Sequence, residues 1–464
     1  MIFSILFLFI NLHVFLHGQT MDFWLTDPDK NILFEEQSPL VPTSTNELIE
    51  NDLTIKVNGS ETYQTIDGFG FALTGGSALL LYNLENITRA QILRELFATD
   101  EKNIGTSFLR VSIGSSDLDE SVFSYDDLPE GETDENLTHF TLDRDQMYLI
   151  PVLKEILQIN PNIKILGSPW SPPVWMKTNR KSVGGYLLKR FYDAYALYFV
   201  RYVQGMKGEG IHIHAITIQN EPLYGGNNPS MVMHAEDQTE FIKKNLGPAF
   251  QKYSIDTKIW IYDHNPDRPD YALTVLADQE ARQYVDGSAF HMYAGSIDVL
   301  SLIHAVHPDK NLYFTEQWVG APGNLKSDLA WHIKTLIVGA TRNWARNVIE
   351  WNLASDSKWE PHTPGGCDNC LGALTIDGNL IHSPRNPSYY IIAHAAKFVR
   401  PDSIRIGSNI VNGLANVAFQ RQDDQQKVLI ILNENAQPTT IQIHSDGKNY
   451  SVQLNGGAVG TFIW

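Results

Sequence analysis

Two glutamates that each end a strand-like segment are the side chains best suited to chemistry in this sequence. Glu221 lies near the end of the apolar segment 211–222, and Glu316 lies near the end of segment 311–318. A pair of carboxyl groups can hydrolyse a glycosidic bond with retention of configuration when they stand about 5–5.5 Å apart. A glutamate on its own is usually a solvated or salt-bridged residue, so the hypothesis requires that both face one pocket.

The elements that must position these glutamates follow a regular alternation. Between residues 64 and 355, short apolar segments alternate with longer amphipathic ones, which is typical of β–α units. Eight strands are predicted, at 65–73, 106–113, 164–168, 214–219, 258–262, 288–293, 312–316 and 347–351. Helices are predicted at 88–98, with Thr88 as N-cap, and at 146–158, 189–206, 236–250, 271–284 and 328–343. This pattern predicts an α/β fold, a (β/α)₈ TIM barrel. A doubly wound sheet is the structural alternative, but no GxGxxG opens a helix after the first strand.

The C-terminal part has a different pattern. After a helix at 387–398, short strands separated by Asp, Asn, Gly and Pro are predicted at 416–420, 427–433, 439–444, 450–454 and 460–464, which indicates a β-sandwich. Segments 24–35 and 54–57 precede the barrel and are expected to add strands to this β-sandwich. The predicted organisation is a signal peptide at 1–18, an N-terminal segment of the sandwich at 19–63, the catalytic barrel at 64–398 and the C-terminal β-sandwich at 399–464.

Composition excludes several classes of protein. The formal net charge is −18 and no long basic run occurs, which argues against nucleic acid or an anionic membrane as the main partner. The apolar start, residues 2–16, has the length of a secretory signal, although no Lys or Arg precedes it. No later segment is apolar for about 18 residues, so no transmembrane segment is expected after the signal. We expect a secreted, extracytoplasmic or lysosomal protein.

The sequence has two cysteines, Cys367 and Cys370, in GGCDNC. A CxxC pair can be a redox motif, half a zinc site or a local disulfide. Zinc would need two more ligands, and neither a second CxxC nor a spaced histidine pair supplies them. In an exported protein, a disulfide that pins a loop is the favoured interpretation.

If the barrel is correct, the carboxyl ends of its strands carry a ring of polar and aromatic side chains. Arg110 could orient a carboxylate and keep it ionised, or be an ordinary structural ion pair. Trp170 and Trp351 could stack on a sugar ring or pack under loops. Asp117 and Asn220 could bind sugar hydroxyls, although Asp117 could instead be a turn or N-cap residue. His291 and Tyr293 could tune the nucleophile, and Tyr293 is also a candidate for contact with the sugar. The alternative for His291 is a core histidine hydrogen-bonded to the backbone.

Seven segments carry a family resemblance: GFGFALTGGSA, FLRVSIGSSD, SPWSPPVWMK, TIQNEP, FTEQWVG, EWNLA and KFVRP. They resemble glycoside hydrolase family 30, the family of lysosomal glucosylceramidase, over nearly the whole chain after residue 24. The resemblance implies a barrel with a β-sandwich built from both chain ends. It implies Glu221 as acid/base and Glu316 as nucleophile. It also places Asp117, Trp170, Asn220 and Trp351 at the positions that hold the terminal glucose.

The same resemblance includes departures that concern the aglycone. Ile218 and Gln219 stand before Asn220-Glu221 where vertebrate glucosylceramidases have TAENEP, and Glu350 and Met292 replace an aspartate and a tryptophan. The GGCDNCLGALTI segment is more similar to members that act on β-1,6-glucans or to uncharacterised exported relatives. The leading hypothesis is a retaining β-glucosidase that acts on a β-glucosyl lipid such as glucosylceramide. An endo-β-1,6-glucanase is the second hypothesis.

Two hypotheses of other classes stand beside these. A catalytically silent carbohydrate-binding protein could use the same scaffold, but the presence of both glutamates beside Asn220 argues against it. A metal-dependent hydrolase would need a ligand pattern such as HExxH, which the sequence lacks. No cofactor or metal is expected. The expected partner is a β-glucoside, glycolipid or glucan, and a lipid substrate would call for an apolar rim or a lipid-presenting partner.

Overall fold

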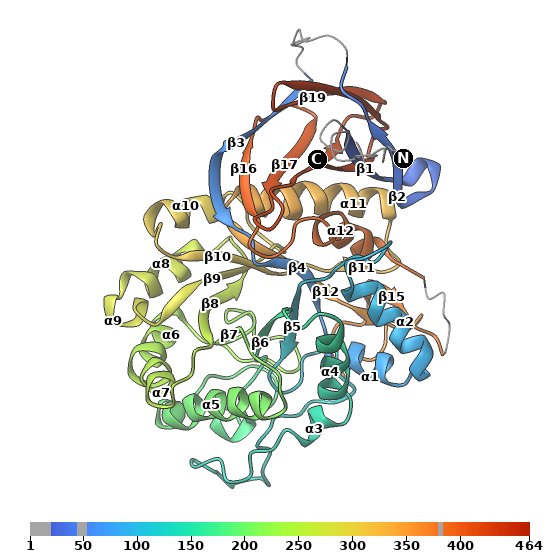
Figure 1. Cartoon of the computed structure of the whole chain (residues 1–464). Helices are drawn as coiled ribbons and strands as arrows, with labels where there is room; N and C mark the ends of the chain where they lie inside the picture. Colours follow the sequence, from blue (N-terminus) through green and yellow to red (C-terminus); the bar gives the residue numbers. More distant parts are fainter. Residues whose placement is uncertain (1–19, 44–52, 379–383) are drawn as a thin grey trace, which may run out of the picture.

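The computed structural model of the chain describes residues 20–43, 53–378 and 384–464, so the predicted signal peptide lies outside the described residues. Figure 1 shows a barrel with its surrounding helices in one half of the molecule and a layered β-structure, formed by both chain ends, in the other. Within the described ranges, no helix has the length and apolar character needed to cross a membrane.

Eight parallel strands close into a barrel in the order β10-β12-β4-β5-β6-β7-β8-β9, which confirms the predicted fold. Their bounds are β4 Gly68–Ala72, β5 Phe108–Ser112, β6 Lys164–Ser168, β7 Ala215–Thr217, β8 Lys258–His264, β9 Val285–His291, β10 Asn311–Glu316 and β12 Ala345–Asn352. Each of them overlaps one of the eight strands predicted from the sequence. Because the strands are parallel, all eight carboxyl ends open on the same face.

The helices surround the barrel, and four of the predicted helices differ from the observed ones. The observed helices are α1 Gly75–Tyr82, α2 Asn86–Phe97, α3 Asp143–Gln146, α4 Leu149–Ile159, α5 Tyr192–Gly208, α6 Ala235–Phe241, α7 Gly247–Lys252, α8 Pro269–Ala277, α9 Gln279–Arg282, α10 Val299–Val306, α11 Leu325–His332 and α12 Pro387–Ala396. Thr88 is buried inside α2 and is not its N-cap, because the helix begins two residues earlier. The predicted helix 271–284 breaks at Asp278, whose carboxylate accepts hydrogen bonds from the first backbone N–H groups of α9. The predicted helices 236–250 and 328–343 contain π-helical stretches at Ile242–Leu246 and Ile333–Ala340.

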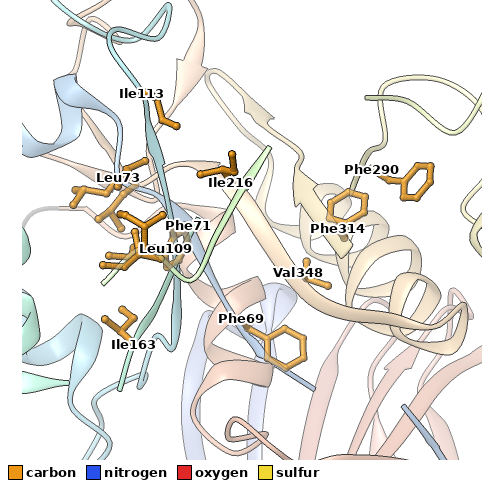
Figure 2. Packing of buried hydrophobic residues seen from close by; sticks show 14 of the residues in the cluster. Phe69, Phe71, Leu73, Leu109, Ile113, Ile163, Ile216, Phe290, Phe314 and Val348 are labelled. Carbon is orange, nitrogen blue, oxygen red and sulfur yellow. The ribbon is translucent and has the colours of Figure 1, made fainter. Parts of the chain in front are cut away.

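Alternation along the strands separates two apolar layers. Side chains on the outer face of the barrel, such as Phe69, Leu109, Phe290 and Phe314, pack against the helices (Figure 2). The inner face carries one apolar residue from each of seven strands: Phe108, Leu166, Ala215, Trp260, Ala289, Tyr313 and Ile349. Successive strand residues face opposite sides, so the residue two positions later also points inward.

That next inward layer is polar and lies toward the carboxyl ends of the strands. Two residues after the apolar layer come Arg110, Ser168, Thr217, His291, Thr315 and Trp351. In β8 the rule changes, because Tyr262 and Asp263 adopt positive φ values of 71° and 67° and the register with β9 shifts there. Because of this irregularity, the side chain of Asp263 points inward and joins the polar layer. β-Bulges beside active sites often redirect a side chain in this way.

The second half is one nine-stranded system, in the order β2-β1-β21-β18-β17-β16-β3-β19-β20. The strands are β1 Met21–Asp27, β2 Ile32–Leu40, β3 Thr54–Thr65, β16 Ile404–Ser408, β17 Leu414–Gln420, β18 Lys427–Asn433, β19 Thr439–Ser445, β20 Lys448–Leu454 and β21 Val459–Ile463. β3 joins two layers, since its first residues pair with β19 and its later ones with β16. The predicted segment 24–35 forms parts of two strands, and β16 was not predicted. Two short pairs, β11 Val319–Gly320 with β14 Cys370–Leu371 and β13 Ala354–Ser355 with β15 Leu374–Thr375, lie at the loops.

An ion-pair cluster closes the opposite end of the barrel. Asp67, buried just before β4, accepts hydrogen bonds from Lys164 at 2.6 Å and from two nitrogens of Arg346 at 3.0 Å. The cluster therefore joins the amino ends of β4, β6 and β12. Burial would raise the pKa of Asp67, but Arg346 and Lys164 lower it to about 2.

We predict that Asp67→Asn lowers the free energy of unfolding by about 3 kcal/mol at pH 7, because two cations lose their buried partner. Since the folded-state pKa is lowered, this stabilisation is complete above about pH 4 and disappears as the pH falls towards 2. Urea unfolding of both proteins measures the difference. Asp100→Asn, which removes an exposed carboxylate paired with Arg94, is the control and should leave the midpoint unchanged. Equal midpoints for wild type and Asp67→Asn would contradict the account.

Candidate active site

Glu221 and Glu316 face the same cavity at the carboxyl ends of the barrel strands. The cavity has a volume of about 510 Å³, and both glutamates line it. One oxygen of each carboxyl group lies within 4.8 Å of the other, and a nitrogen of His291 lies within the same distance of both. The separation agrees with the range for retention, about 5–5.5 Å, and is too short for the water-filled gap of an inverting pair.

A fully buried guanidinium holds one of these carboxylates. Arg110 donates to Glu316 and, with its other amino group, to Asp263 at 2.8 Å. Its remaining donors reach Ser168 Oγ at 3.1 Å and Asn220 Oδ1 at 2.8 Å. Because Arg110 has only donors, it fixes the orientation of the Asn220 amide and leaves the NH₂ group of Asn220 to donate to a ligand.

Asp263 is the buried anion around which the site is organised. Its carboxylate accepts hydrogen bonds from Arg110 at 2.8 Å and from the hydroxyls of Thr217 and Thr315 at 2.7 Å each. His291 Nε2 lies 3.1 Å from it. Burial opposes the charge, but the Arg110 guanidinium and these hydrogen bonds hold the pKa of Asp263 well below its usual range.

His291 is enclosed by carboxylates on both ring nitrogens. Nε2 faces Asp263, while Nδ1 lies 3.2 Å from Glu221 and 3.7 Å from Glu316. Burial alone would lower the pKa of His291, but the charge of Glu316 and the hydrogen bonds with Asp263 and Glu221 raise it to about 9. The ring is therefore an imidazolium at neutral pH and donates from both nitrogens.

Glu221 and Glu316 titrate as a coupled pair. Burial raises the pKa of Glu316, and the charge of Glu221 raises it further, against the opposing charges of His291 and Arg110. Burial alone would raise the pKa of Glu221 as well, but its hydrogen bond with His291 lowers this pKa below its usual value. The buried cations Arg110 and His291 balance two anions, so with Asp263 ionised the pair keeps one proton. Tyr293 donates its hydroxyl to Glu316 at 2.9 Å and, with Arg110, favours the charged form of that residue.

The predicted substrate-binding residues line the cavity, and the predicted supporting residues lie behind its wall. Asp117, Trp170, Asn220, Tyr293 and Trp351 line it, while Arg110 and His291 are fully buried beneath. Trp170 and Trp351 stack on each other at 5.3 Å between centroids, and the Arg110 guanidinium lies 4.8 Å and 5.7 Å from their rings. The two indoles thus cover the guanidinium and also form part of the cavity wall.

The two cysteines lie at the same cavity. A disulfide joins Cys367 and Cys370, and both residues line the wall. The backbone N–H of Cys367 donates to Asp117 at 3.3 Å. Burial and the charge of Glu316 raise the pKa of Asp117 to about 7, although the Cys367 N–H acts in the opposite direction. The disulfide loop therefore positions a carboxyl group that titrates near neutral pH.

Five lining residues were not among the predicted site residues: Tyr224, Asn227, His264, Asn265 and Trp318. Asn227 donates to Glu221 at 3.4 Å, and His264 Nε2 lies 3.9 Å from the same carboxyl group. His264 and Asn265 directly follow Asp263 at the end of β8, so their position at a strand end was the available signal. Tyr224 and Asn227 lie in a loop and carried no comparable signal.

Two groups of described side chains are close enough to hold a metal ion. They are Glu221, His291 and Glu316 in the cavity, and Asp126, Asp134 and His139 in the loop after β5. In the cavity, the raised pKa of His291 makes it a proton donor at neutral pH, whereas a ligand must be deprotonated. In the loop, His139 Nδ1 already lies at hydrogen-bond distance, 2.9 Å, from a carboxylate oxygen of Asp134.

Comparison with known proteins gives consistent matches over the described barrel and sandwich. The model of the glycosyl hydrolase family 30 TIM-barrel domain matches residues 66–399, and that of the family 30 beta sandwich domain matches 402–462. An endo-1,6-beta-D-glucanase of Neurospora crassa is 36% identical over 429 residues, 89% of this chain and 88% of that protein. The lysosomal acid glucosylceramidase of Mus musculus is 27% identical over 442 residues, 89% of this chain and 83% of that protein. A solved endo-beta1,6-glucanase structure has a TM-score of 0.88 and 32% identity, covering 96% of this chain and 99% of that one.

We predict that Asp263→Asn lowers the pKa of His291 below its value of about 9, because a neighbouring negative charge is lost. Without the Asp263 carboxylate, Arg110 and His291 lose the group that positions them, and kcat/KM should fall by about a hundredfold. Histidine NMR titration and kinetics measure the two effects. Asp286→Asn is the matched control, since Asp286 begins the neighbouring strand β9 at the opposite end of the barrel and pairs with Lys258. An unchanged His291 pKa would contradict the assignment.

Proposed function

The chain belongs to glycoside hydrolase family 30, and from this membership we propose that it hydrolyses β-glucosidic bonds with retention, acting on β-1,6-linked glucan. The observation that carries the proposed reaction is the spacing of the two carboxyl groups, with one oxygen of each within 4.8 Å of the other in a single cavity. That spacing suits a covalent intermediate, since it leaves no room for a water on the far side of the sugar.

In the first step, an oxygen of Glu316 attacks the anomeric carbon while Glu221 gives its proton to the departing glycosidic oxygen. The carbon–oxygen bond to the leaving sugar breaks, and a glucosyl ester forms on Glu316. This step needs Glu316 ionised and Glu221 protonated. In the free site, burial raises the pKa of Glu316 and His291 lowers that of Glu221, so the proton must pass from Glu316 to Glu221 when the sugar binds. Arg110 and Tyr293 favour this transfer, because both donate hydrogen bonds to Glu316 and neither loses its own proton in the working range.

In the second step, Glu221 takes a proton from a water molecule, and the resulting oxygen nucleophile attacks the anomeric carbon. The ester bond to Glu316 breaks, so the β-configuration is restored and both carboxyl groups return to their initial states. His291 holds a proton beside both carboxyl groups throughout and limits the repulsion between them when both are charged. Asn220 and Asp117 are placed to bind hydroxyls of the glucose at this site.

The choice of β-1,6-glucan rests on similarity and on the cavity rim. The relatives named as endo-1,6-β-glucanases reach 36% and 32% identity, against 27% for the mouse glucosylceramidase. Tyr224 and Trp318 add aromatic rings to the cavity wall, on which further glucose units of a polymer can stack. We therefore place the glucan ahead of the glucosyl lipid that the sequence alone favoured.

A glucosyl lipid is the second candidate, and the similarity to glucosylceramidases over 89% of the chain favours it. It would call for the lipid-presenting partner or apolar rim named above. For either substrate we propose action outside the cytoplasm. The Cys367–Cys370 disulfide supports this, because such bonds persist in oxidising compartments.

We predict that the protein releases soluble sugars from β-1,6-glucan faster than it releases glucose from glucosylceramide, and that the β-anomer appears first. Proton NMR of the products reports the linkage, the mode of attack and the anomer together. A faster reaction with glucosylceramide would place the lipid first. An α-anomer as the first product would contradict retention.

We also predict that Glu316→Gln lowers kcat on β-1,6-glucan by at least about a thousandfold, because the covalent nucleophile is lost. Glu221→Gln should lower the rate with poor leaving groups far more than with an activated aryl glucoside, which needs no protonation. Added azide should restore turnover of the aryl glucoside by Glu221→Gln as a glycosyl azide. Turnover by Glu316→Gln within tenfold of wild type would show that Glu316 is not the nucleophile.

A further inference from the structure

A second hollow lies away from the catalytic cavity, between α11 of the barrel and loops of the sandwich. Its volume is about 640 Å³, which exceeds that of the catalytic cavity. The residues of its wall that matter here are Asn324, Lys326, Trp331, Lys334, Glu434 and Asn435. We call it the α11 hollow. None of these residues belongs to the reaction described above.

The α11 hollow has an exposed indole held by a fixed helix. Trp331 is 41% exposed, although it is among the largest side chains of the chain. The next residue, His332, is buried and lies 2.7 Å from Glu350 of β12, which ties this end of α11 to the barrel. The rings of Trp331 and His332 make an edge contact, with their centroids 4.9 Å apart. The π-helical stretch Ile333–Ala340 follows directly, and such stretches are frequent at functional sites.

The charged groups around this indole neutralise one another. Lys326 lies 2.6 Å from Asp29, and Lys334 forms an ion pair with Glu434. With each cation paired, the α11 hollow offers no net charge to attract an anionic or cationic ligand. Its recognition chemistry is therefore an aromatic face beside neutral hydrogen-bonding groups.

Two asparagines supply complementary hydrogen-bonding groups. Asn324 uses Oδ1 to cap α11 by accepting the Ser327 N–H at 3.0 Å, so its amide NH₂ is the group that can donate to a ligand. Asn435 donates its NH₂ to Gly413 at 3.2 Å and Asn433 at 2.9 Å, so its Oδ1 is the group that can accept. Hydroxyl groups, which both donate and accept, match this pair.

We propose that the α11 hollow is a secondary binding site for a neutral polysaccharide, with Trp331 as the stacking platform for a sugar ring. Its chemistry is that of the catalytic cavity, where indoles and an asparagine amide also line the wall. The site holds a glucan chain near the enzyme while other parts of the same chain are cleaved. The identity of the polysaccharide as β-1,6-glucan rests on the proposed function.

The test compares polymer binding without turnover. In a Glu316→Gln background, β-1,6-glucan in a native gel should retard migration, and adding Trp331→Ala should raise the dissociation constant about tenfold. Trp331→Phe should keep most of the retardation, because it preserves an aromatic face. Tyr253→Ala is the matched control, since Tyr253 is a similarly exposed aromatic residue at 39% and lies outside both cavities.

Kinetics of the otherwise unchanged enzyme separate the two proposals. Trp331→Ala should lower kcat/KM on long β-1,6-glucan and leave it unchanged on a β-1,6-linked trisaccharide. If the Glu316→Gln protein binds the polymer equally tightly with and without Trp331→Ala, the secondary site is refuted and the proposed reaction stands. If the wild type neither binds nor hydrolyses β-1,6-glucan, but Trp331 is needed to bind another neutral glucan, the secondary site stands and the proposed substrate is wrong. Tighter binding of a charged polysaccharide than of any neutral one would refute the assigned ligand class.

Discussion

The structure depends on keeping three carboxyl groups and two cations together in a buried site. Arg110 bridges Asp263 and Glu316, and His291 lies between Asp263 and the two reacting glutamates. Removing either cation would leave buried anions without compensation, which costs several kcal/mol and would shift the proton of the pair. The charge balance thus supports folding of the barrel mouth and is the basis of the distinct roles that we propose for Glu221 and Glu316.

Strand alternation explains how much of the fold could be predicted. All eight barrel strands were recognisable as short apolar segments, and seven of them add a residue to the inner apolar layer and carry polar or aromatic residues at the carboxyl end. The π-helical stretches and the break at Asp278 were not, since they arise from tertiary packing and local capping that leave the apolar period intact. The buried N-cap candidate Thr88 failed for a related reason: a threonine also fits the first turn of a helix that begins earlier.

The candidate site was predictable where residues follow a strand in register and unpredictable elsewhere. Arg110 and His291 lie in the inward series, two residues after Phe108 and Ala289. Asp263 breaks the series, because the two positive φ values before the end of β8 exchange its orientation with that of Tyr262, and a sequence pattern cannot reveal that irregularity. Loop residues of the cavity have no periodic signal at all. We propose that these loop residues contact the substrate beyond the first sugar, which explains why the family could be predicted from the sequence more readily than the aglycone.

The central claim is that Glu316, held by Arg110 and Tyr293, becomes covalently bound to the sugar. Incubation with a 2-deoxy-2-fluoro-β-glucoside that carries a good leaving group should trap the intermediate, because the fluorine slows the second step more than the first. Peptide mass spectrometry of the digested protein locates the label. The account predicts a single fluoroglucosyl group on Glu316 and none on Glu221. Inactivation with the label on another residue, or turnover without any labelled peptide, would contradict it.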